Sequence, residues 1–188
     1  MIIDDDFLPQ ELVEKIQQEM LHGETPWVLT KELISKDYRF NTNFDPYRGS
    51  QFNHLFFIAH KQLSPHWDMV LDTFKFFCDK NNIMPWAITR AKANLTFPDP
   101  HINSQHTEAP HTDHSWPHYV FLYYINDSDG DTILYNEKFD DNKEVVLTEQ
   151  ARVSPKAGRA ILFDGLHYHS PLTPTKNYRA VINLTFVG

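Results

Sequence analysis

The chain has 188 residues, a formal net charge of −8 at pH 7 and a hydrophobic content of 41%, so it can bury a sizeable core and does not have a disordered composition. The acidic balance makes nucleic acid an unlikely partner, because proteins that bind phosphate backbones usually present a basic surface. No apolar run is long enough to span a bilayer, the acidic opening residues do not resemble a signal peptide, and the single cysteine fits a reducing compartment, so we expect a cytoplasmic protein without a membrane partner.

The first half of the chain predicts two helices. Apolar residues recur at three- and four-residue spacing over residues 12–20, just after Pro9, and again over residues 65–80. Ser64 is a candidate N-cap for the second helix. Between the two helices, residues 23–53 are irregular apart from a short strand at 27–29 and a turn at 45–49.

From Trp86 onward, short β-type runs alternate with residues that favour turns. These runs are Trp86–Phe97, Tyr119–Asn126, Thr132–Tyr135, Glu144–Leu147, Arg159–Phe163 and Tyr178–Val187. Such a series predicts an antiparallel sandwich or barrel. We therefore expect one mainly β domain over residues 1–188, with helical support and lid elements in residues 1–85 and a β-rich catalytic core in residues 86–188.

Eleven histidines are unusual for this length, and several cluster between residues 101 and 118. Two metal ligands on one strand must share a face, so they lie two residues apart. His111 and Asp113 have this spacing. Two imidazoles and one carboxylate leave three coordination positions open, which suits the iron(II) of oxygenases.

Two other pairs have a similar pattern. His66 and Asp68 fall at the start of the second predicted helix, where residues two apart point in nearly opposite directions, so we reject them. His106 and Glu108 lie in a polar loop with the opposite parity to His111, and they remain a less favoured alternative. His54, His60 and His118 are expected to lie on the surface or to be hydrogen-bonded within the core.

A third ligand has to come from a distant strand, where His167 and His169 are the candidates. Arg179 follows ten residues after His169 and begins a run in which every second residue includes Asn183 and Thr185. An arginine on the inner face of a barrel needs an anionic partner, and the far carboxylate of a 2-oxo diacid would supply one.

Two further groups of polar residues are predicted to lie near this pocket. Tyr124 shares parity with Val120 and Leu122, so it either packs in the core or reaches the pocket. Arg90, Lys92 and Asn94 alternate with small apolar residues on a predicted strand. They form either a solvated face or, with Asn94 and one basic residue, the mouth of the pocket.

Residues 109–187 resemble the 2-oxoglutarate/Fe(II) dioxygenase superfamily, and its prolyl-4-hydroxylase-like branch in particular. The opening Ile3–Pro9 is similar to that of many members, and the chain departs from the family mildly where Asp129 replaces a turn glycine. The motifs that carry the resemblance are Pro110-His111-Thr112-Asp113, Leu122–Asn126, Asp129-Gly130-Asp131-Thr132, Val153-x-Pro155-x-x-Gly158-Arg159-x-x-x-Phe163, Phe163-x-Gly165-x-x-x-His169, and Arg179.

The resemblance implies a double-stranded β-helix (jelly-roll) core braced by the N-terminal helices. It implies Fe(II) bound by His111, Asp113 and His169, rather than His167, as the catalytic metal. It also implies 2-oxoglutarate with its far carboxylate at Arg179 and Tyr124. We expect Asn183 and Asn94 to contribute to the cosubstrate pocket.

The same resemblance implies dioxygen as the second cosubstrate, with ascorbate as a compatible further cofactor, and release of succinate and carbon dioxide. Because the metal-binding carboxylate is present, hydroxylation is favoured over halogenation. The expected substrate is a peptidyl residue, such as proline, or a small amino-acid-like molecule. Residues 40–53 and 98–110 are the predicted lids.

Two alternatives are less favoured. Nucleic-acid dealkylases of the superfamily usually end in Arg-x-Asn-x-Thr-Phe-Arg, whereas this chain has Val181 and Val187 where the arginines would lie. A non-catalytic cupin-like metal-binding protein is the other alternative, but it would have no need for an interior cation such as Arg179. The sequence does not indicate an oligomeric state.

Overall fold

The computed structural model describes residues 1–30, 51–99, 101, 108–140 and 145–188. The predicted turn at 45–49 and most of the two predicted lids lie outside these residues. The helices are α1 (Gln10–Gln17), a single π-turn η1 (Gln18–His22) and α2 (Trp67–Asn81). The strands are β1 (Ile2–Asp4), β2 (Val28–Thr30), β3 (Gln51–Ile58), β4 (Lys61–Gln62), β5 (Ala87–Thr96), β6 (Tyr119–Tyr124), β7 (Thr132–Lys138), β8 (Glu149–Val153), β9 (Ala160–Asp164), β10 (His167–Pro171) and β11 (Arg179–Val187).

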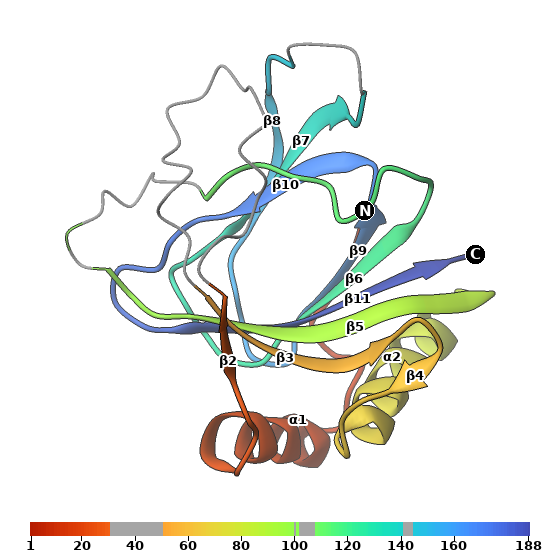
Figure 1. Cartoon of the computed structure of the whole chain (residues 1–188), viewed down its shortest axis with the longest axis vertical. Helices are drawn as coiled ribbons and strands as arrows, with labels where there is room; N and C mark the ends of the chain where they lie inside the picture. The colour runs from red at the N-terminus through yellow and green to blue at the C-terminus, as the bar shows by residue number, and fades with distance from the viewer. Residues whose placement is uncertain (31–50, 100, 102–107, 141–144) are drawn as a thin grey trace.

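Two antiparallel sheets face each other. The larger sheet has the strand order β1-β9-β6-β11-β5-β3-β2, with β4 paired to β3, and the smaller has the order β10-β7-β8. Figure 1 shows the larger sheet curving below the smaller one, with α1 and α2 on its outer face. This arrangement confirms the predicted mainly β fold with a jelly-roll core braced by the N-terminal helices.

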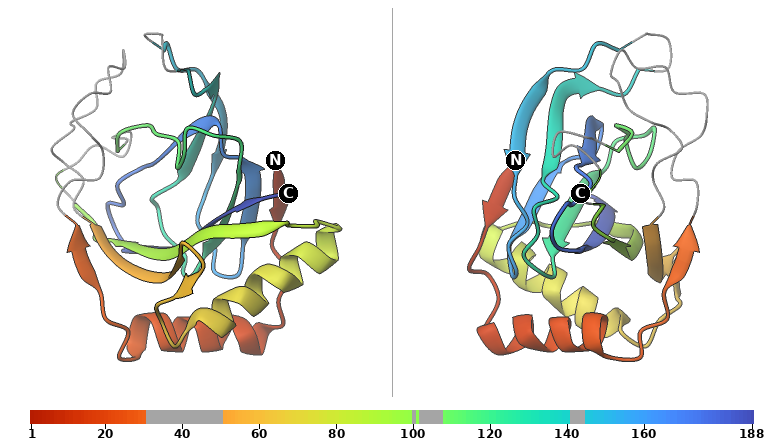
Figure 2. Two further views of the ribbon diagram at one scale, coloured as in Figure 1. Left: turned by 45° about the vertical axis from the view of Figure 1, so that its right-hand side comes forward. Right: turned by 90° about the vertical axis from the view of Figure 1, so that its left-hand side faces the viewer.

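The helices pack against the larger sheet through one apolar cluster. Phe74 and Phe77 of α2 and Ile16 of α1 are fully or almost fully buried there, against Phe121 and Phe186 of the sheet. The turned views in Figure 2 show both helices on the side of the sheet away from β7 and β8. Among the described residues, no helix combines the length and the apolar composition needed to cross a bilayer.

Strand alternation gives the central strands two different faces. On β5 and β11, Ala91, Ala93, Ile182 and Leu184 lie in the cluster under the helices. The residues between them are mostly polar and face the smaller sheet, where Val120, Leu122, Tyr124, Leu134 and Val181 form a second apolar cluster. The polar set comprises Arg90, Lys92, Asn94, Arg179, Asn183 and Thr185. This face is the one from which a site can be built.

Some predicted elements differ from the structure. Strand β8 begins at Glu149, after the predicted run Glu144–Leu147, of which Glu144 lies outside the described residues. Val145 and Leu147 pack against a third apolar cluster without belonging to β8. Strand β3 was not predicted. Ser64 does not cap α2: its hydroxyl accepts the backbone N–H of His66, which itself precedes the helix without a side-chain cap. The described part of residues 1–85 therefore supplies four strands as well as the helices.

Candidate metal centre

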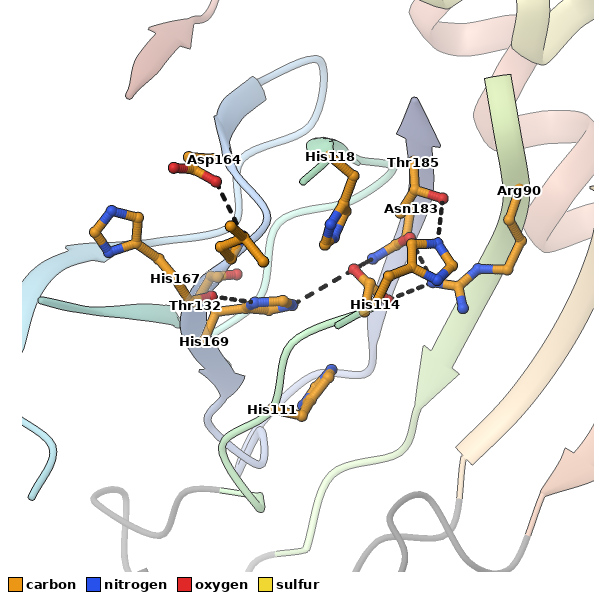
Figure 3. Close-up of polar contacts among 12 residues, drawn as sticks. Arg90, His111, His114, His118, Thr132, Asp164, His167, His169, Asn183 and Thr185 are labelled. Carbon is orange, nitrogen blue, oxygen red and sulfur yellow. Dashed lines mark hydrogen bonds and ion pairs between the residues drawn. The ribbon is translucent and has the colours of Figure 1, made fainter. Parts of the chain in front are cut away.

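His111, Asp113 and His169 come together although they belong to different parts of the fold. One ligand atom of each lies within 4.8 Å of the others. His111 precedes β6, and its backbone pairs with that of His169 on β10 through two N–H···O bonds of 2.9 Å. This antiparallel bridge fixes the two imidazoles beside each other, with ring centroids 4.6 Å apart (Figure 3).

The backbone also fixes which ring nitrogen of each histidine is free. His111 Nδ1 lies 3.1 Å from the Ala109 carbonyl oxygen, and His169 Nδ1 lies 3.3 Å from that of His167. A carbonyl oxygen only accepts, so Nδ1 carries the proton and Nε2 keeps its lone pair. Burial lowers the pKa of both rings, that of His169 to about 3 with help from His111, so both rings are neutral at pH 7.

Asp113 is held from the larger sheet. Arg90 Nη2 donates to its Oδ1, and Asn183 Nδ2 donates to its Oδ2 at 3.2 Å. Oδ2 also lies 3.7 Å from His169 Nε2. Burial alone would raise the pKa of Asp113, but Arg90, followed by the two imidazoles, brings it well below its usual range. The site thus offers two neutral nitrogens and one carboxylate, a donor set that fits iron(II).

Among the described residues, the competing candidates are not part of this group. His66 immediately precedes α2, with its Nδ1 3.8 Å from Glu19, and Asp68 is exposed on the first turn of the helix. His106 lies outside the described residues, while Glu108 is buried beside Arg179. His167 Nδ1 donates to the Tyr135 carbonyl at 2.9 Å, and its ring points away from His111 in Figure 3.

Three histidines that were expected to lie on the surface or to be hydrogen-bonded in the core, His54, His60 and His118, do so. His54 is buried and bonded to the Pro26 carbonyl and the Ser64 hydroxyl, and His60 is exposed in the turn between β3 and β4. His118 is buried, and its Nδ1 donates to the Trp116 carbonyl at 2.7 Å. A Cβ on Gly165 would lie 2.1 Å from His118 Nε2, which explains the glycine in the motif before His169.

A second polar cluster lies at the start of β11. The buried Arg179 donates from Nε to the Gly130 carbonyl and from Nη2 to Thr132 Oγ1, both at 2.8 Å. Tyr124 also donates to Thr132 Oγ1, at 2.7 Å, and its ring centroid is 5.8 Å from the guanidinium carbon. Burial lowers the pKa of Arg179. It also raises the pKa of Glu108 to about 7, which Arg179 opposes.

Asp129, the departure from the family turn, has a structural role. Its carboxylate accepts the Thr175 backbone N–H at 3.0 Å, the Thr175 hydroxyl at 2.6 Å and the Lys176 N–H at 3.2 Å. These bonds anchor the loop that leads into β11. The substitution for glycine therefore adds a support behind Arg179.

The remaining predicted residues lie on the inner face. Asn183 donates to Asp113, and Asn94 lies opposite Val181. Within the described residues, the buried Asn94 Oδ1 has no hydrogen-bond partner. Their predicted binding of cosubstrate stays a prediction. Arg90 and Lys92, which the sequence left between a solvated face and the site, lie on the inner face opposite Thr185 and Asn183. Thr132 was missed as a site residue, although it stands in the turn motif.

Comparison with known proteins identifies structures with a similar fold but finds no close relative by sequence. No family model and no curated protein matches the chain.

Solved structures match over nearly the whole chain. An oxidoreductase of the 2OG-Fe(II) oxygenase family from Burkholderia pseudomallei is 13% identical, with a TM-score of 0.60 over 93% of this chain and 76% of that one. A prolyl hydroxylase from Trichoplax adhaerens, in complex with a hypoxia inducible factor peptide fragment, is 14% identical, with a TM-score of 0.64 over 99% and 82%. The alpha-ketoglutarate-dependent epimerase SnoN from nogalamycin biosynthesis is 12% identical, with a TM-score of 0.64 over 99% and 77%. The chain therefore has the fold of 2OG-Fe(II) oxygenases, prolyl hydroxylases among them.

Proposed function

We propose that the protein is a non-haem Fe(II) oxygenase that uses 2-oxoglutarate, with His111, Asp113 and His169 as the metal ligands. The observation that carries the proposal is the convergence of these three donors, each with a free lone pair, in the same interior as the buried Arg179. The shared fold supports it, because similar structures belong to this class of oxygenase.

In this proposal, Arg179 binds the far carboxylate of 2-oxoglutarate, and Thr132 and Tyr124 position the guanidinium. Thr132 Oγ1 accepts hydrogen bonds from both Arg179 and Tyr124, so its own proton is free to be donated to a ligand carboxylate. Fe(II) with 2-oxoglutarate would supply dioxygen-dependent oxidation, with succinate and carbon dioxide as products. The apolar cluster around Tyr124 would exclude water from the pocket.

The reaction that we propose is hydroxylation of a peptidyl residue, such as proline, or of a small amino-acid-like molecule. Retention of Asp113 as a ligand supports it. A nucleic-acid dealkylase is less well supported, because Val181 and Val187 stand where that group usually has arginines. A metal-binding protein without oxygenase activity would leave the buried cation of Arg179 without a purpose.

The test is 2-oxoglutarate binding by the full chain with Mn(II) in place of iron, measured by calorimetry, followed by succinate release with Fe(II) in air. Arg179→Met should lose about tenfold or more in 2-oxoglutarate affinity while keeping the metal, because a carboxylate loses its bidentate partner. Asp113→Ala should lose the metal. Arg152→Met, which removes an arginine paired with Glu149 at the surface, is the matched control and should behave as the wild type.

Two results would overturn the proposal. One is a wild-type protein that binds Mn(II) but no 2-oxoglutarate. The other is equal 2-oxoglutarate affinity in the wild type and in Arg179→Met.

A further inference from the structure

Apart from the cluster around Arg179, a further group of polar residues occupies the inner face of β3 and β5, next to the candidate metal centre. Asn53 and Asn94 are directly opposite each other in the β3–β5 ladder, and Lys92 is opposite Asn183 in the β5–β11 ladder. Lys92 and Asn94 are two residues apart, so they share a face. Asn183 in turn donates a hydrogen bond to Asp113, so Lys92 is adjacent to a residue that contacts a proposed metal ligand.

The two asparagines have unfilled hydrogen-bonding capacity. Asn53 Nδ2 bonds to Thr30 Oγ1 at 2.6 Å, but its Oδ1 is buried without a partner among the described residues. Asn94 Oδ1 is likewise buried and has no hydrogen-bond partner among the described residues. Buried polar atoms are rarely left unsatisfied in folded proteins, and those that are often mark a place for a ligand.

Among the cationic side chains on the inner face, Lys92 is the one to which no anion has been assigned. Arg90 is paired with Asp113, and the proposed function assigns Arg179 to the far carboxylate of 2-oxoglutarate. Lys92 is partly buried beside Arg90, and in the described part of the chain no carboxylate lies within ion-pair distance of it. Burial, and then Arg90, lower the pKa of Lys92, whereas Asp113 raises it. A desolvated ammonium of this kind is stabilised by an anion.

We propose that Lys92, Asn94 and Asn53 form the substrate subsite, with Asn94 assigned to the substrate rather than to 2-oxoglutarate, and that the substrate is a small carboxylic acid with a polar group beside its carboxylate, such as a free amino acid. Lys92 binds the carboxylate, and the two side-chain amides bind the neighbouring polar group. The inference rests on the proposed function and narrows its substrate class. It selects a small acid over a residue within a peptide, whose backbone carries no carboxylate.

The experiment measures binding to the full chain with Mn(II), with and without 2-oxoglutarate, by calorimetry and thermal shift. The probes are free L-amino acids, the same compounds as carboxamides, and neutral peptides capped at both ends. At least one free acid should bind, with its carboxamide about tenfold or more weaker, because the charge-assisted bond to Lys92 is lost. Lys92→Met should remove this preference and Lys92→Arg should keep most of it. Lys75→Met, which removes an exposed lysine of α2, should change nothing.

The outcomes separate the two proposals. If 2-oxoglutarate binds normally to Lys92→Met, the variant is folded and the cosubstrate pocket is intact. The subsite is overturned if no free acid binds, if acid and carboxamide bind equally, or if a capped peptide binds with the same affinity in the wild type and Lys92→Met. Absence of 2-oxoglutarate binding would overturn the proposed function, whereas Lys92-dependent binding of an acid to the Mn(II) protein would still establish the subsite.

Discussion

The carbonyl oxygen of Gly130 accepts a hydrogen bond from Arg179 Nε, and the missing side chain of this glycine lets two neighbours approach. A Cβ at this position would lie 2.8 Å from the Leu172 carbonyl oxygen and 3.0 Å from Arg179 Cδ. The Gly130 backbone is thus packed directly against the Arg179 side chain. The orientation of the guanidinium therefore depends on the absence of a side chain at residue 130.

Gly130→Ala should therefore displace Arg179. We expect a loss of stability of about 1–3 kcal/mol from overpacking, and a weaker affinity for 2-oxoglutarate without loss of metal binding. Urea denaturation and calorimetry with Mn(II) would measure the two effects. Unchanged 2-oxoglutarate affinity in a folded Gly130→Ala protein would show that Arg179 does not need this contact.

Asp129 makes the loop before β11 sensitive to acid. Burial opposes ionisation, but the hydrogen bonds from Thr175, Lys176 and Asn177 bring its pKa down to about 2. A carboxyl whose pKa is lower in the folded state contributes stability above its unfolded pKa of about 4, and this contribution is lost as the pH falls toward the folded value.

Asp129→Asn should consequently be less stable than the wild type at pH 7, by on the order of 1 kcal/mol, because a charged acceptor is lost. The difference should shrink between pH 4 and pH 2. Denaturation at a series of pH values would measure it. A difference that stays constant with pH would contradict the role of the carboxylate charge.

At the scale of strands and helices, the sequence predicted those elements whose pattern is local. Helix α2 was found because burial of one face leaves an apolar stripe in the sequence, and β5 and β11 were found because polar and apolar residues alternate along much of their length. Strand β6 was found as a short apolar run bounded by turn residues. Strand β8 was misplaced because its residues Glu149–Val153 are mostly polar and lie at an edge, whereas the apolar run before it packs without being a strand. Strand β10, with two histidines and a final proline, carries no such period.

The candidate site shows the same limit. Spacing and family resemblance indicated His111, Asp113, His169 and Arg179, and the structure brings the first three together. The contact of Arg90 with Asp113 could not be predicted, because the two residues are far apart in the sequence and the whole fold brings them together. Register between distant strands is set by the whole fold and leaves no mark on either segment alone.

Helix α2 offers a matched pair of residues for testing the outer layer. Phe74 is 1% exposed, with ring centroids 5.3 Å from Phe121 and 5.0 Å from Phe186, whereas Phe76 is 44% exposed. Phe74→Ala should destabilise the protein by about 3–5 kcal/mol through loss of apolar burial and the cavity left behind. Phe76→Ala should cost far less. Urea denaturation measures both, and similar losses would show that α2 does not brace the sheet as described.

At the scale of the whole molecule, the candidate metal centre connects the two sheets. His169 belongs to the smaller sheet, whereas Asp113 is bonded to Arg90 and Asn183 of the larger one. A metal held by all three would therefore add a link between the layers that is absent from the unfolded chain.

Mn(II) at about a hundred times its dissociation constant should stabilise the protein by about 2.7 kcal/mol, which raises Tm by about 5–10 °C for a chain of this size. A chelator should reverse the shift, and Asp113→Asn should abolish most of it. Asp68→Asn, which changes the exposed half of the rejected pair, serves as the control and should retain the full shift. An equal shift in Asp113→Asn would remove Asp113 from the ligand set.

The two faces of β5 make this strand intolerant of changes in length. Ala91 and Ala93 fit beneath the helices only because they are small, while Arg90, Lys92 and Asn94 between them face the interior of the barrel. A single inserted or deleted residue would exchange the two sets over part of the strand. It would drive long charged side chains into the helix contact and place alanines beside the candidate ligand Asp113. Homologues that preserve the activity should therefore vary in length in the loops on either side of β5, and not within it.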